Sequence, residues 1–437
     1  MSPLRDKSSS SFDEWFQETF CYGQERVNLS LSRMIEVKRR LPKINAPVIL
    51  VGGTNGKGST CAYLEAIYCR AGYRVGSFIS PHMITVRERI KYNGAMFPED
   101  VWIELSTSLI SGFSDLNLTY FESITALSFI FWQKYPADVL IYEVGLGGAL
   151  DATNVLDPEC SIVSSVDLDH QNYLGDDRES IGREKAGIFR NGKAAICGDL
   201  SPPNSLLECA VREGAKLCCL QRDFFVSWEP VDSKQWRYSS PMGTWKALPV
   251  PSMRGRHQLR NASCALRAVQ ELFNCLPVSV NDIRAAFIST AVPGRFQVIP
   301  GQPSVVLDVA HNPSGVGCLR DTLVDMPYSP NTMAVFSCLC DKDRYSMVEL
   351  IKDQFCHWFV CELPSSRSCS LGDIVSSLQD VGVDMSVVHT SSDPFDSYGK
   401  AYSMASLEDR IVIFGSFYLI GAFLQKSSFL WHESRYL

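Results

Sequence analysis

The chain has 437 residues, which is enough for two or three domains with full hydrophobic cores. Hydrophobic residues make up 46% of it and charged residues 20%, as is usual for a soluble globular protein. The formal net charge of −7 argues against a nucleic-acid-binding protein, and no window reaches the roughly 18 uncharged apolar residues of a membrane span.

The N-terminal residues MSPLRDKSSSSFDEW lack the apolar stretch of a secretory signal, and the Ser run at 8–11 predicts a disordered lead-in. We therefore expect a cytoplasmic protein. Sixteen cysteines are scattered through the chain, and the pairs Cys218-Cys219 and Cys338-x-Cys340 do not have the spacing of zinc ligands. We expect them to be buried, reduced thiols.

Strands alternate with helices through the first two thirds of the chain, which predicts a parallel sheet with helices on both faces. The apolar run 47–53 ends in glycines, and apolar residues recur at helical spacing over 59–71, so a strand, a glycine loop and a helix are predicted here. Further strands are predicted at 73–79, 138–144 and 160–166, and further helices at 101–110, 121–132, 180–189, 204–213 and 259–273.

Two later stretches differ in composition. Aromatic, Pro and alternating polar residues near 223–250 predict a small antiparallel insertion, and a Pro- and Gly-rich stretch at 291–302 predicts a domain boundary. Strands expected near 304–309, 332–338, 357–362, 384–389 and 410–415, with helices between them, form a smaller Rossmann-like unit. The predicted fold class is α/β, with domains of residues 1–296 and 297–437.

The stretch VGGTNGKGST at 51–60 is similar to the phosphate-binding loop GxxxxGK[ST], but Gly58 separates Lys57 from Ser59. The loop lies between a strand and a helix, so free N–H groups and the helix dipole favour an anion. Gly56 and Gly58 let the backbone approach a phosphate, Lys57 supplies positive charge, and Ser59 offers a hydroxyl to Mg²⁺. The alternative is a tight turn with an exposed Lys57.

The segments YEVGLGG (142–148) and SVDLDHQ (165–171) each follow a buried strand. Because the carboxyl ends of parallel strands share one edge of a sheet, we expect Glu143 and His170 to lie beside the glycine loop. A carboxylate there can hold Mg²⁺, and a His on the same rim is a candidate metal ligand. The alternatives are a Glu that caps a turn and a structural His.

Lys185 lies in the segment ESIGREKAGIF at 179–189. If this segment is helical, Lys185 shares an apolar stripe with Ile181, Ile188 and Phe189. Burial favours the neutral amine, which can act as a nucleophile or add CO₂ to form a carbamate, an anionic metal ligand. The alternative is a Lys whose stem covers the core while its ammonium group reaches water.

Three more segments surround the predicted boundary. HQLRN at 257–261 begins a helix, PGRF at 293–296 lies in the hinge, and LDVAHNP at 307–313 ends a strand. Arg295 could reach phosphates and Asp308 could accept ribose hydroxyls. Taken singly, these residues are also ordinary turn and cap positions.

Together the segments resemble the folylpolyglutamate synthase/dihydrofolate synthase branch of the Mur ligase superfamily. The resemblance runs in family order from residue 53 to residue 421 and is highly specific. The matching stretches are GTNGKGS (53–59), SPH (80–82), ERIKYNG (88–94), TYFE (119–122), YEVGLGG (142–148), LDATN (150–154), DLDH (167–170), REKAGIF (183–189), HQLRNA (257–262), PGRF (293–296), DVAHNP (308–313), CDKD (340–343) and FGSFYLIG (414–421).

The resemblance implies an ATP- and Mg²⁺-dependent amide ligase of folate biosynthesis. The γ-phosphate of ATP passes to a carboxylate, and the amino group of L-glutamate attacks the acyl phosphate. The acceptor is dihydropteroate, a reduced folate, or both. Residues 1–296 would form the ATPase domain and 297–437 the glutamate-ligase domain, which close about a hinge near 293–303 to exclude water. We expect a monomer whose partners are small molecules, without nucleic acid or membrane.

The resemblance also implies roles for individual residues. Those implied to bind ATP are Asn55, Gly56, Lys57, Gly58, Ser59, Asn261, Arg295 and Asp308. Those implied to hold two Mg²⁺ ions are Ser59, Ser80, Glu143, His170 and Lys185, the last as a carbamate. Those implied to bind the acceptor or glutamate are Ser80, Phe121, Glu122, Asp151, His311 and Ser416. Those implied to act in catalysis are Lys57, Glu143, His170 and Lys185.

Ala149 departs from the family pattern, which has Arg between GLGG and LDATN. The substitution puts substrate preference in doubt and leaves the residues of the ligase chemistry in place. Two other functions stay open at this point. A UDP-muramyl amino-acid ligase would carry a UDP-binding domain before the ATP loop, which begins here at residue 53. A non-catalytic nucleotide-binding regulator would not need Glu143, His170 and Lys185 together.

Overall fold

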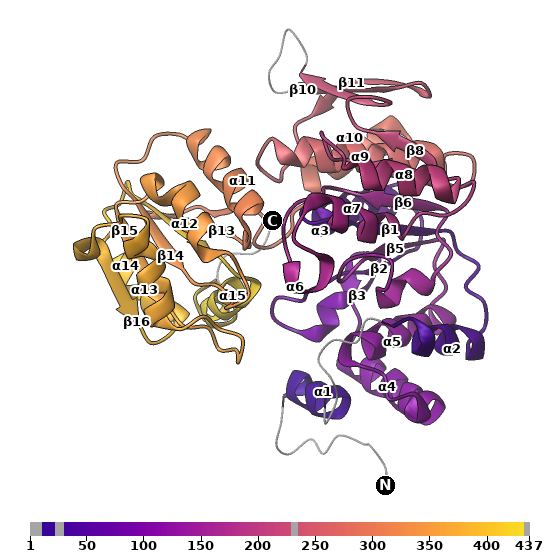
Figure 1. The fold of residues 1–437 in the computed structure, drawn as a ribbon, viewed down its shortest axis with the longest axis horizontal. Helices are drawn as coiled ribbons and strands as arrows, with labels where there is room; N and C mark the ends of the chain where they lie inside the picture. The colour runs from indigo at the N-terminus through magenta and orange to yellow at the C-terminus, as the bar shows by residue number, and fades with distance from the viewer. Residues whose placement is uncertain (1–10, 22–29, 229–234, 432–437) are drawn as a thin grey trace. The chain divides into compact units, whose positions relative to one another are not determined.

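The computed structural model describes residues 11–21, 30–228 and 235–431 (Figure 1). Within this part of the chain, none of the helices combines the length and hydropathy needed to cross a bilayer. Residues 8–10 of the lead-in predicted at 8–11 lie outside the described residues. The chain divides into two compact units, the first made of Met1–Asp167, Asn172–Pro251 and Leu259–Thr290, and the second of Leu168–Gln171, Ser252–Gln258 and Ala291–Leu437.

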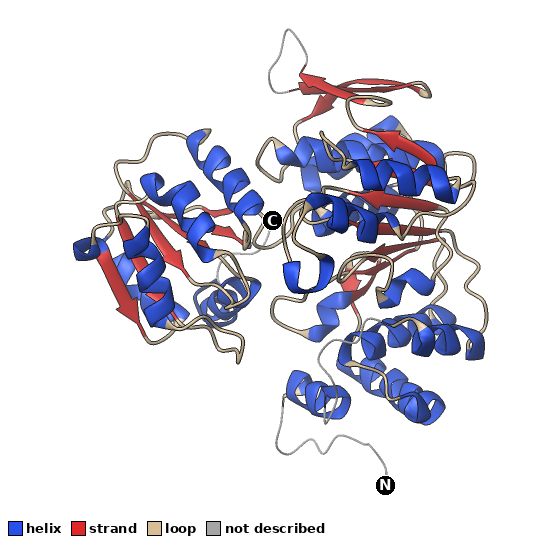
Figure 2. Ribbon diagram, in the orientation of Figure 1, coloured by secondary structure: helices blue, strands red, loops and turns tan. Residues whose placement is uncertain are grey.

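The first unit contains an eight-stranded sheet with helices above and below it (Figure 2). In spatial order the strands are β4 (Ala95–Met96), β3 (Ile90–Tyr92), β2 (Val75–Phe78), β5 (Val139–Glu143), β1 (Val48–Gly52), β6 (Cys160–Val163), β7 (Ala194–Cys197) and β8 (Lys216–Cys219). Its α-helices are α1 (Phe12–Cys21), α2 (Ser32–Arg40), α3 (Lys57–Arg70), α4 (Glu99–Phe113), α5 (Tyr120–Lys134), α6 (Gln171–Leu174), α7 (Arg178–Ala186), α8 (Asn204–Glu213), α9 (His257–Glu271) and α10 (Val280–Ser289), of which α6 and α9 begin in residues of the second unit.

The sheet is mixed, although a parallel sheet was predicted. Strands β2, β5, β1, β6, β7 and β8 run parallel, whereas β3 and β4 pair antiparallel at one edge. β3 pairs antiparallel with β2, and the dipeptide Asn93-Gly94, with φ angles of 53° and 76°, forms the two-residue hairpin turn that makes β4 antiparallel to β3. This signal was present in the sequence.

The predicted antiparallel insertion is confirmed by three strands, β9 (Phe225–Trp228), β10 (Gln235–Ser240) and β11 (Gly243–Pro249). Residues 229–234 of the predicted range lie outside the described residues. Fifteen cysteines between residues 61 and 369 are free thiols, as expected. Cys275 and Cys340 are exposed, so the expectation of burial was wrong for these two.

The second unit, coloured orange to yellow in Figure 1 from residue 291 onward, has a six-stranded sheet with helices on both faces. In spatial order its strands are β12 (Gln297–Ile299), β13 (Ser304–Asp308), β17 (Arg410–Phe414), β14 (Thr332–Phe336), β15 (His357–Cys361) and β16 (Val388–Ser391), all parallel except β12. Its helices are α11 (Pro313–Val324), α12 (Arg344–Ile351), α13 (Leu371–Asp380), α14 (Pro394–Met404) and α15 (Phe417–Trp431).

The strand predicted at 384–389 is displaced toward the C-terminus. Asp384 accepts a hydrogen bond from the backbone N of Ser386 (2.9 Å) and begins a 3₁₀ turn over Met385–Val387, so the strand starts only at Val388. The domain boundary at 296/297 stays a prediction.

Candidate active site

The register of β1 determines where the candidate site lies. Val51 pairs with Glu143 on β5 and with Ile162 on β6, both in parallel. The carboxyl ends of the three strands therefore share one edge of the sheet. The glycine loop, Glu143 and the segment after β6 lie at that edge.

The glycine loop is held by the segment that follows β6. The N–H of Thr54 donates to the carbonyl oxygen of Ser165 (2.8 Å), and the hydroxyl of Ser164 donates to the carbonyl oxygen of Asn55 (2.7 Å). A side chain at Gly53, whose φ is 135°, would come within 2.1 Å of that hydroxyl. This glycine is therefore required by the close approach of the two segments.

Helix α3 begins at Lys57, directly after Gly56, whose φ of 86° only glycine adopts readily. A Cβ at Gly56 would meet the side-chain oxygen of Asn261 at 2.3 Å, so this predicted ATP-binding residue lies against the loop. The ammonium group of Lys57 donates to the carbonyl oxygens of Gly53 (3.0 Å) and Thr54 (3.1 Å). The loop, its lysine and a helix N-terminus thus lie together, an arrangement that favours an anion.

Glu143 ends β5 and is 3% exposed. One of its carboxylate oxygens accepts a hydrogen bond from the backbone N of Ser80 (3.0 Å), in the segment that follows β2. The structure thus brings together two residues predicted to bind the same Mg²⁺. Oxygen donors and a few protein ligands beside phosphate suit this ion, so the residues fit the metal.

Lys185 is buried, with 3% of its surface exposed, as its place in the apolar stripe predicted. Its helix ends at Ala186, so Ile188 and Phe189 lie beyond the helix, although both are buried. A Cβ at Gly148 would lie 2.9 Å from the carbonyl oxygen of Lys185, so the glycines after Glu143 allow the loop to contact this helix.

The predicted pterin-side residues lie near the same loop. The ring of Phe121 contacts Gly145 so closely that a Cβ there would approach it to 2.4 Å, and it packs edge-on against Phe78. The buried Asp151 carboxylate accepts hydrogen bonds from the N–H groups of Leu146 (2.8 Å) and Thr153 (3.0 Å). Burial raises the pKa of Asp151 above its ordinary value, although these hydrogen bonds oppose the shift.

Glu122 also makes hydrogen bonds within the protein through its carboxylate. Its carboxylate accepts hydrogen bonds from Arg33 Nε (2.9 Å) and from the backbone N of Thr119 (2.8 Å), where it completes the capping box of α5. In the described structure its carboxylate is used for helix capping and an ion pair, and its predicted contact with substrate stays a prediction.

Two predicted residues of the second unit lie beside the Phe417 ring, and a third, Ser416, precedes it in the sequence. The guanidinium carbon of Arg295 lies 5.3 Å from the Phe417 ring centre, and the His311 ring lies 5.7 Å from it. Ser416 is buried and its hydroxyl accepts a hydrogen bond from the N–H of Tyr418 (3.1 Å).

Asp308 accepts hydrogen bonds from the N–H groups of Phe296 (2.9 Å) and Ala310 (2.7 Å). Burial raises the pKa of Asp308 to about 6, against these hydrogen bonds and the charge of Arg295. The carboxylate thus fixes the PGRF turn, in which Phe296 has a φ of 43°.

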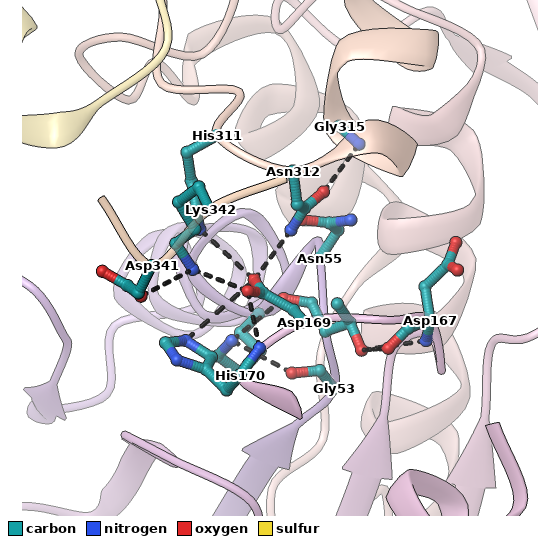
Figure 3. Close-up of polar contacts among 12 residues, drawn as sticks. Gly53, Asn55, Asp167, Asp169, His170, His311, Asn312, Gly315, Asp341 and Lys342 are labelled. Atoms are coloured by element: carbon teal, nitrogen blue, oxygen red, sulfur yellow. Dashed lines mark hydrogen bonds and ion pairs between the residues drawn. The ribbon is translucent and has the colours of Figure 1, made fainter. Parts of the chain in front are cut away.

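A buried carboxylate beside His170 was not predicted as a site residue. Asp169 accepts hydrogen bonds from Lys342 Nζ (2.6 Å), from the Asn312 amide (2.9 Å) and from the backbone N of His170 (2.8 Å), and His311 Nε2 lies 3.6 Å away (Figure 3). Burial opposes its ionisation, but the hydrogen bond to His311 and the nearby positive charges keep the pKa of Asp169 well below its usual range. These residues come from the DLDH, DVAHNP and CDKD motifs. Membership of these motifs was the only indication in the sequence that the residues belong to one site.

His82, two residues after Ser80, was likewise not predicted. Its Nδ1 accepts a hydrogen bond from Arg89 Nε (2.9 Å), and the guanidinium of Arg89 lies over the ring of Tyr120. Burial, aided by the charge of Arg89, lowers the pKa of His82 to about 3. A neutral His82 is therefore expected at physiological pH, with the proton on Nε2.

Within the described ranges, no three His, Cys, Asp or Glu side chains gather in a way that could hold a metal by themselves.

Comparisons with known proteins point to one family. The family described as "Mur ligase, glutamate ligase domain" matches residues 294–417. The chain is 35% identical over 421 residues to the dihydrofolate synthase/folylpolyglutamate synthase of Escherichia coli, covering 95% of each chain. It is 30% identical to the enzyme of the same name from Bacillus subtilis, covering 93% of this chain and 96% of that one.

Solved structures agree with the sequence comparisons. E. coli FolC in complex with DHPP and ADP has a TM-score of 0.90 and 33% identity, covering 98% of this chain and 100% of that chain. A bifunctional folylpolyglutamate synthase/dihydrofolate synthase with Mn, AMPPNP and L-glutamate bound has a TM-score of 0.88 and 32% identity, covering 97% and 100%. The fold is therefore shared along nearly the whole chain.

Proposed function

This chain belongs to the dihydrofolate synthase/folylpolyglutamate synthase family, and from that premise we propose how its residues perform the family's reaction. The chain is an ATP-dependent ligase of folate metabolism that attaches L-glutamate to its acceptor. The observation that carries this assignment is the shared sheet edge at which the glycine loop, Glu143 and Ser80 meet. The muramyl-ligase and regulator hypotheses are not needed.

The reaction begins when an oxygen of the acceptor carboxylate attacks the γ-phosphorus of ATP and ADP leaves. Lys57 and the N–H groups at the start of α3 oppose the negative charge that collects on the phosphates. A divalent ion, when held by Ser59, Ser80 and Glu143, would withdraw further charge from the phosphates. The amino nitrogen of L-glutamate then attacks the acyl carbon, and inorganic phosphate leaves as the amide forms.

We assign the other roles as follows. ATP is bound by Asn55, Gly56, Gly58, Asn261, Arg295 and Asp308. The pterin side of the acceptor is bound by Phe121, Glu122 and Asp151. Glutamate is bound by His311 and Ser416. The acceptor is dihydropteroate, a reduced folate, or both, and the enzyme works as a monomer in the cytoplasm. Light scattering on the purified protein tests the monomer.

The decisive experiment measures ADP release by purified protein with dihydropteroate or tetrahydrofolate, with and without L-glutamate. Full turnover should need both acceptor and glutamate, and mass spectrometry should find products one or more glutamyl residues heavier. Lys57→Met removes the ammonium group of the glycine loop, serves as the negative control and should lose turnover. ATP hydrolysis that ignores both acceptor and glutamate would refute the ligase function.

We further propose that Lys185 is carbamylated and helps His170 to hold a second metal ion. Its 3% exposure supports this, because a buried amine that adds CO₂ becomes an anion able to bind a cation. Lys185→Ala should lose about 10- to 100-fold in kcat, the range seen when a group that supports a metal ion is removed. Acetate or propionate should restore part of the rate, whereas full activity without them would remove the carbamate.

A further inference from the structure

Residues Leu168–Gln171 belong to the second compact unit, although the chain on both sides of them belongs to the first. This short segment contains His170, the proposed ligand of the second metal ion. No strand or helix of the second unit directly precedes or follows it in the sequence. Contacts with residues distant in sequence therefore place it in that unit.

Asp169 provides those contacts. Its side chain is 8% exposed and one carboxylate oxygen accepts from Lys342 Nζ (2.6 Å), while the other accepts from the Asn312 amide (2.9 Å). Lys342 is 5% exposed. Two charges buried this deeply are each costly without the other, so the pair is a firm attachment. Figure 3 shows Asp169 at the centre of this cluster, with Lys342, Asn312 and His311 around it.

The same carboxylate controls the backbone of His170. The oxygen that binds Lys342 also accepts the N–H of His170 (2.8 Å). His170 has a φ of 52°, a left-handed conformation that is uncommon for residues other than glycine. The imidazole is one-third exposed, so it is available to a ligand while its main chain is fixed.

We propose that Asp169 is the positioning residue of His170. It holds the left-handed turn from which the imidazole projects, and it makes that orientation depend on Lys342 and Asn312 of the second unit. The inference rests on the proposed function, because it takes His170 as a metal ligand. It adds three residues to the site that act through His170 and do not touch the reacting atoms.

The test measures binding of Mn²⁺ to the full-length protein in the presence of ADP, with free Mn²⁺ followed by electron paramagnetic resonance. His170→Ala identifies the site to which the imidazole contributes. Asp169→Asn keeps an oxygen that can accept from the His170 N–H but removes the ion pair. It should weaken the same site about 10- to 100-fold, the usual effect of removing a partner that orients a metal ligand.

Two further variants make the result specific. Asn312→Ser keeps the cap of α11, since Ser is a good N-cap, but it removes the amide that donates to Asp169. It should weaken the same site by a smaller factor even if Asp169→Asn fails to fold. Asp325→Asn removes an exposed carboxylate of the same unit, paired with Arg256, and should leave Mn²⁺ binding unchanged.

Three outcomes overturn the inference. They are wild-type Mn²⁺ affinity in the folded Asp169→Asn and Asn312→Ser proteins, equal weakening of every site, and Mn²⁺ binding that His170→Ala does not change. Loss of thermal stability without loss of Mn²⁺ affinity means that Asp169 is only structural. If the wild-type protein does not ligate glutamate but Asp169→Asn still weakens the His170-dependent site, the proposed function fails and this inference stands.

Discussion

At the scale of single residues, the Phe121 ring packs so closely against Gly145 that residue 145 has no room for a side chain. The Phe121 ring lies where a Cβ at residue 145 would stand, and it is also held by Phe78. Gly145, the first glycine of YEVGLGG, therefore determines where the Phe121 ring, proposed to bind the pterin, lies. From the proposed role of Phe121, a change at residue 145 should alter acceptor binding and leave the phosphate loop unchanged.

Gly145→Ala should displace the Phe121 ring and raise KM for the acceptor roughly tenfold or more, the effect of one badly placed methyl group in a binding pocket. KM for ATP should stay within about twofold. Steady-state kinetics with each substrate varied in turn measure both values. Gly112→Ala, in α4 with no atom near its added Cβ, is the control and should change neither. An unchanged KM for the acceptor would show that Phe121 does not bind it.

Asp308 makes a pH-dependent contribution to stability. Burial raises its pKa from 3.8 to about 6, so between these values the folded protein holds a proton that the unfolded chain releases. The free energy of unfolding then falls as the pH rises through this window, by up to about 3 kcal/mol. Asp308→Asn cannot ionise and lacks this slope. Urea unfolding from pH 4 to 7 should show the stability difference, wild type minus variant, decreasing with pH, whereas a constant difference would contradict the raised pKa.

At the scale of elements, α5 begins with a complete capping box. The Thr119 hydroxyl accepts from the N–H of Glu122, and the Glu122 carboxylate accepts from the N–H of Thr119. The same carboxylate binds Arg33 on α2, so the cap also joins two helices. The helix that bears Phe121 is thereby fixed at its first turn.

Thr119→Ala should lower the free energy of unfolding by about 1 kcal/mol, because it removes the side-chain half of the cap. Thr119→Ser keeps the hydroxyl and should be close to wild type. Urea titration of both variants beside the wild-type protein measures the difference. Equal loss in the Ser and Ala variants would mean that the methyl group of Thr119, and not its hydroxyl, carries the effect.

The sequence predicted most elements because each strand and helix has its own apolar period. The contact of Asp169 with Lys342, 173 residues away, has no such local signal, because it depends on how two distant loops fold together. Glu122 and Asp151, which the motifs predict to bind the acceptor, also make contacts within the fold that the sequence did not predict. Their carboxylates already accept hydrogen bonds from backbone N–H groups, which residue type alone does not reveal.

At the scale of the whole molecule, each compact unit has its own sheet and hydrophobic core. Independent cores predict separate unfolding transitions. Scanning calorimetry of the full-length protein should resolve two transitions. Thr119→Ala should lower one of them by about 2 to 4 °C, and Val412→Ala, in the core of the second unit, should lower the other by a comparable or larger amount. A single two-state transition in all three proteins would contradict this.

The attachment of residues 168–171 to the second unit also limits how this protein can be recombined with its relatives. A chimera joined near residue 294, where the matched C-terminal domain begins, would take Lys342 and Asn312 from one parent and Asp169 from the other. The ion pair of Asp169 with Lys342 would then have to form between segments from different parents, whose packing has not been selected together. Exchange of residues 168–171 and 252–258 together with the C-terminal domain keeps these partners from the same parent.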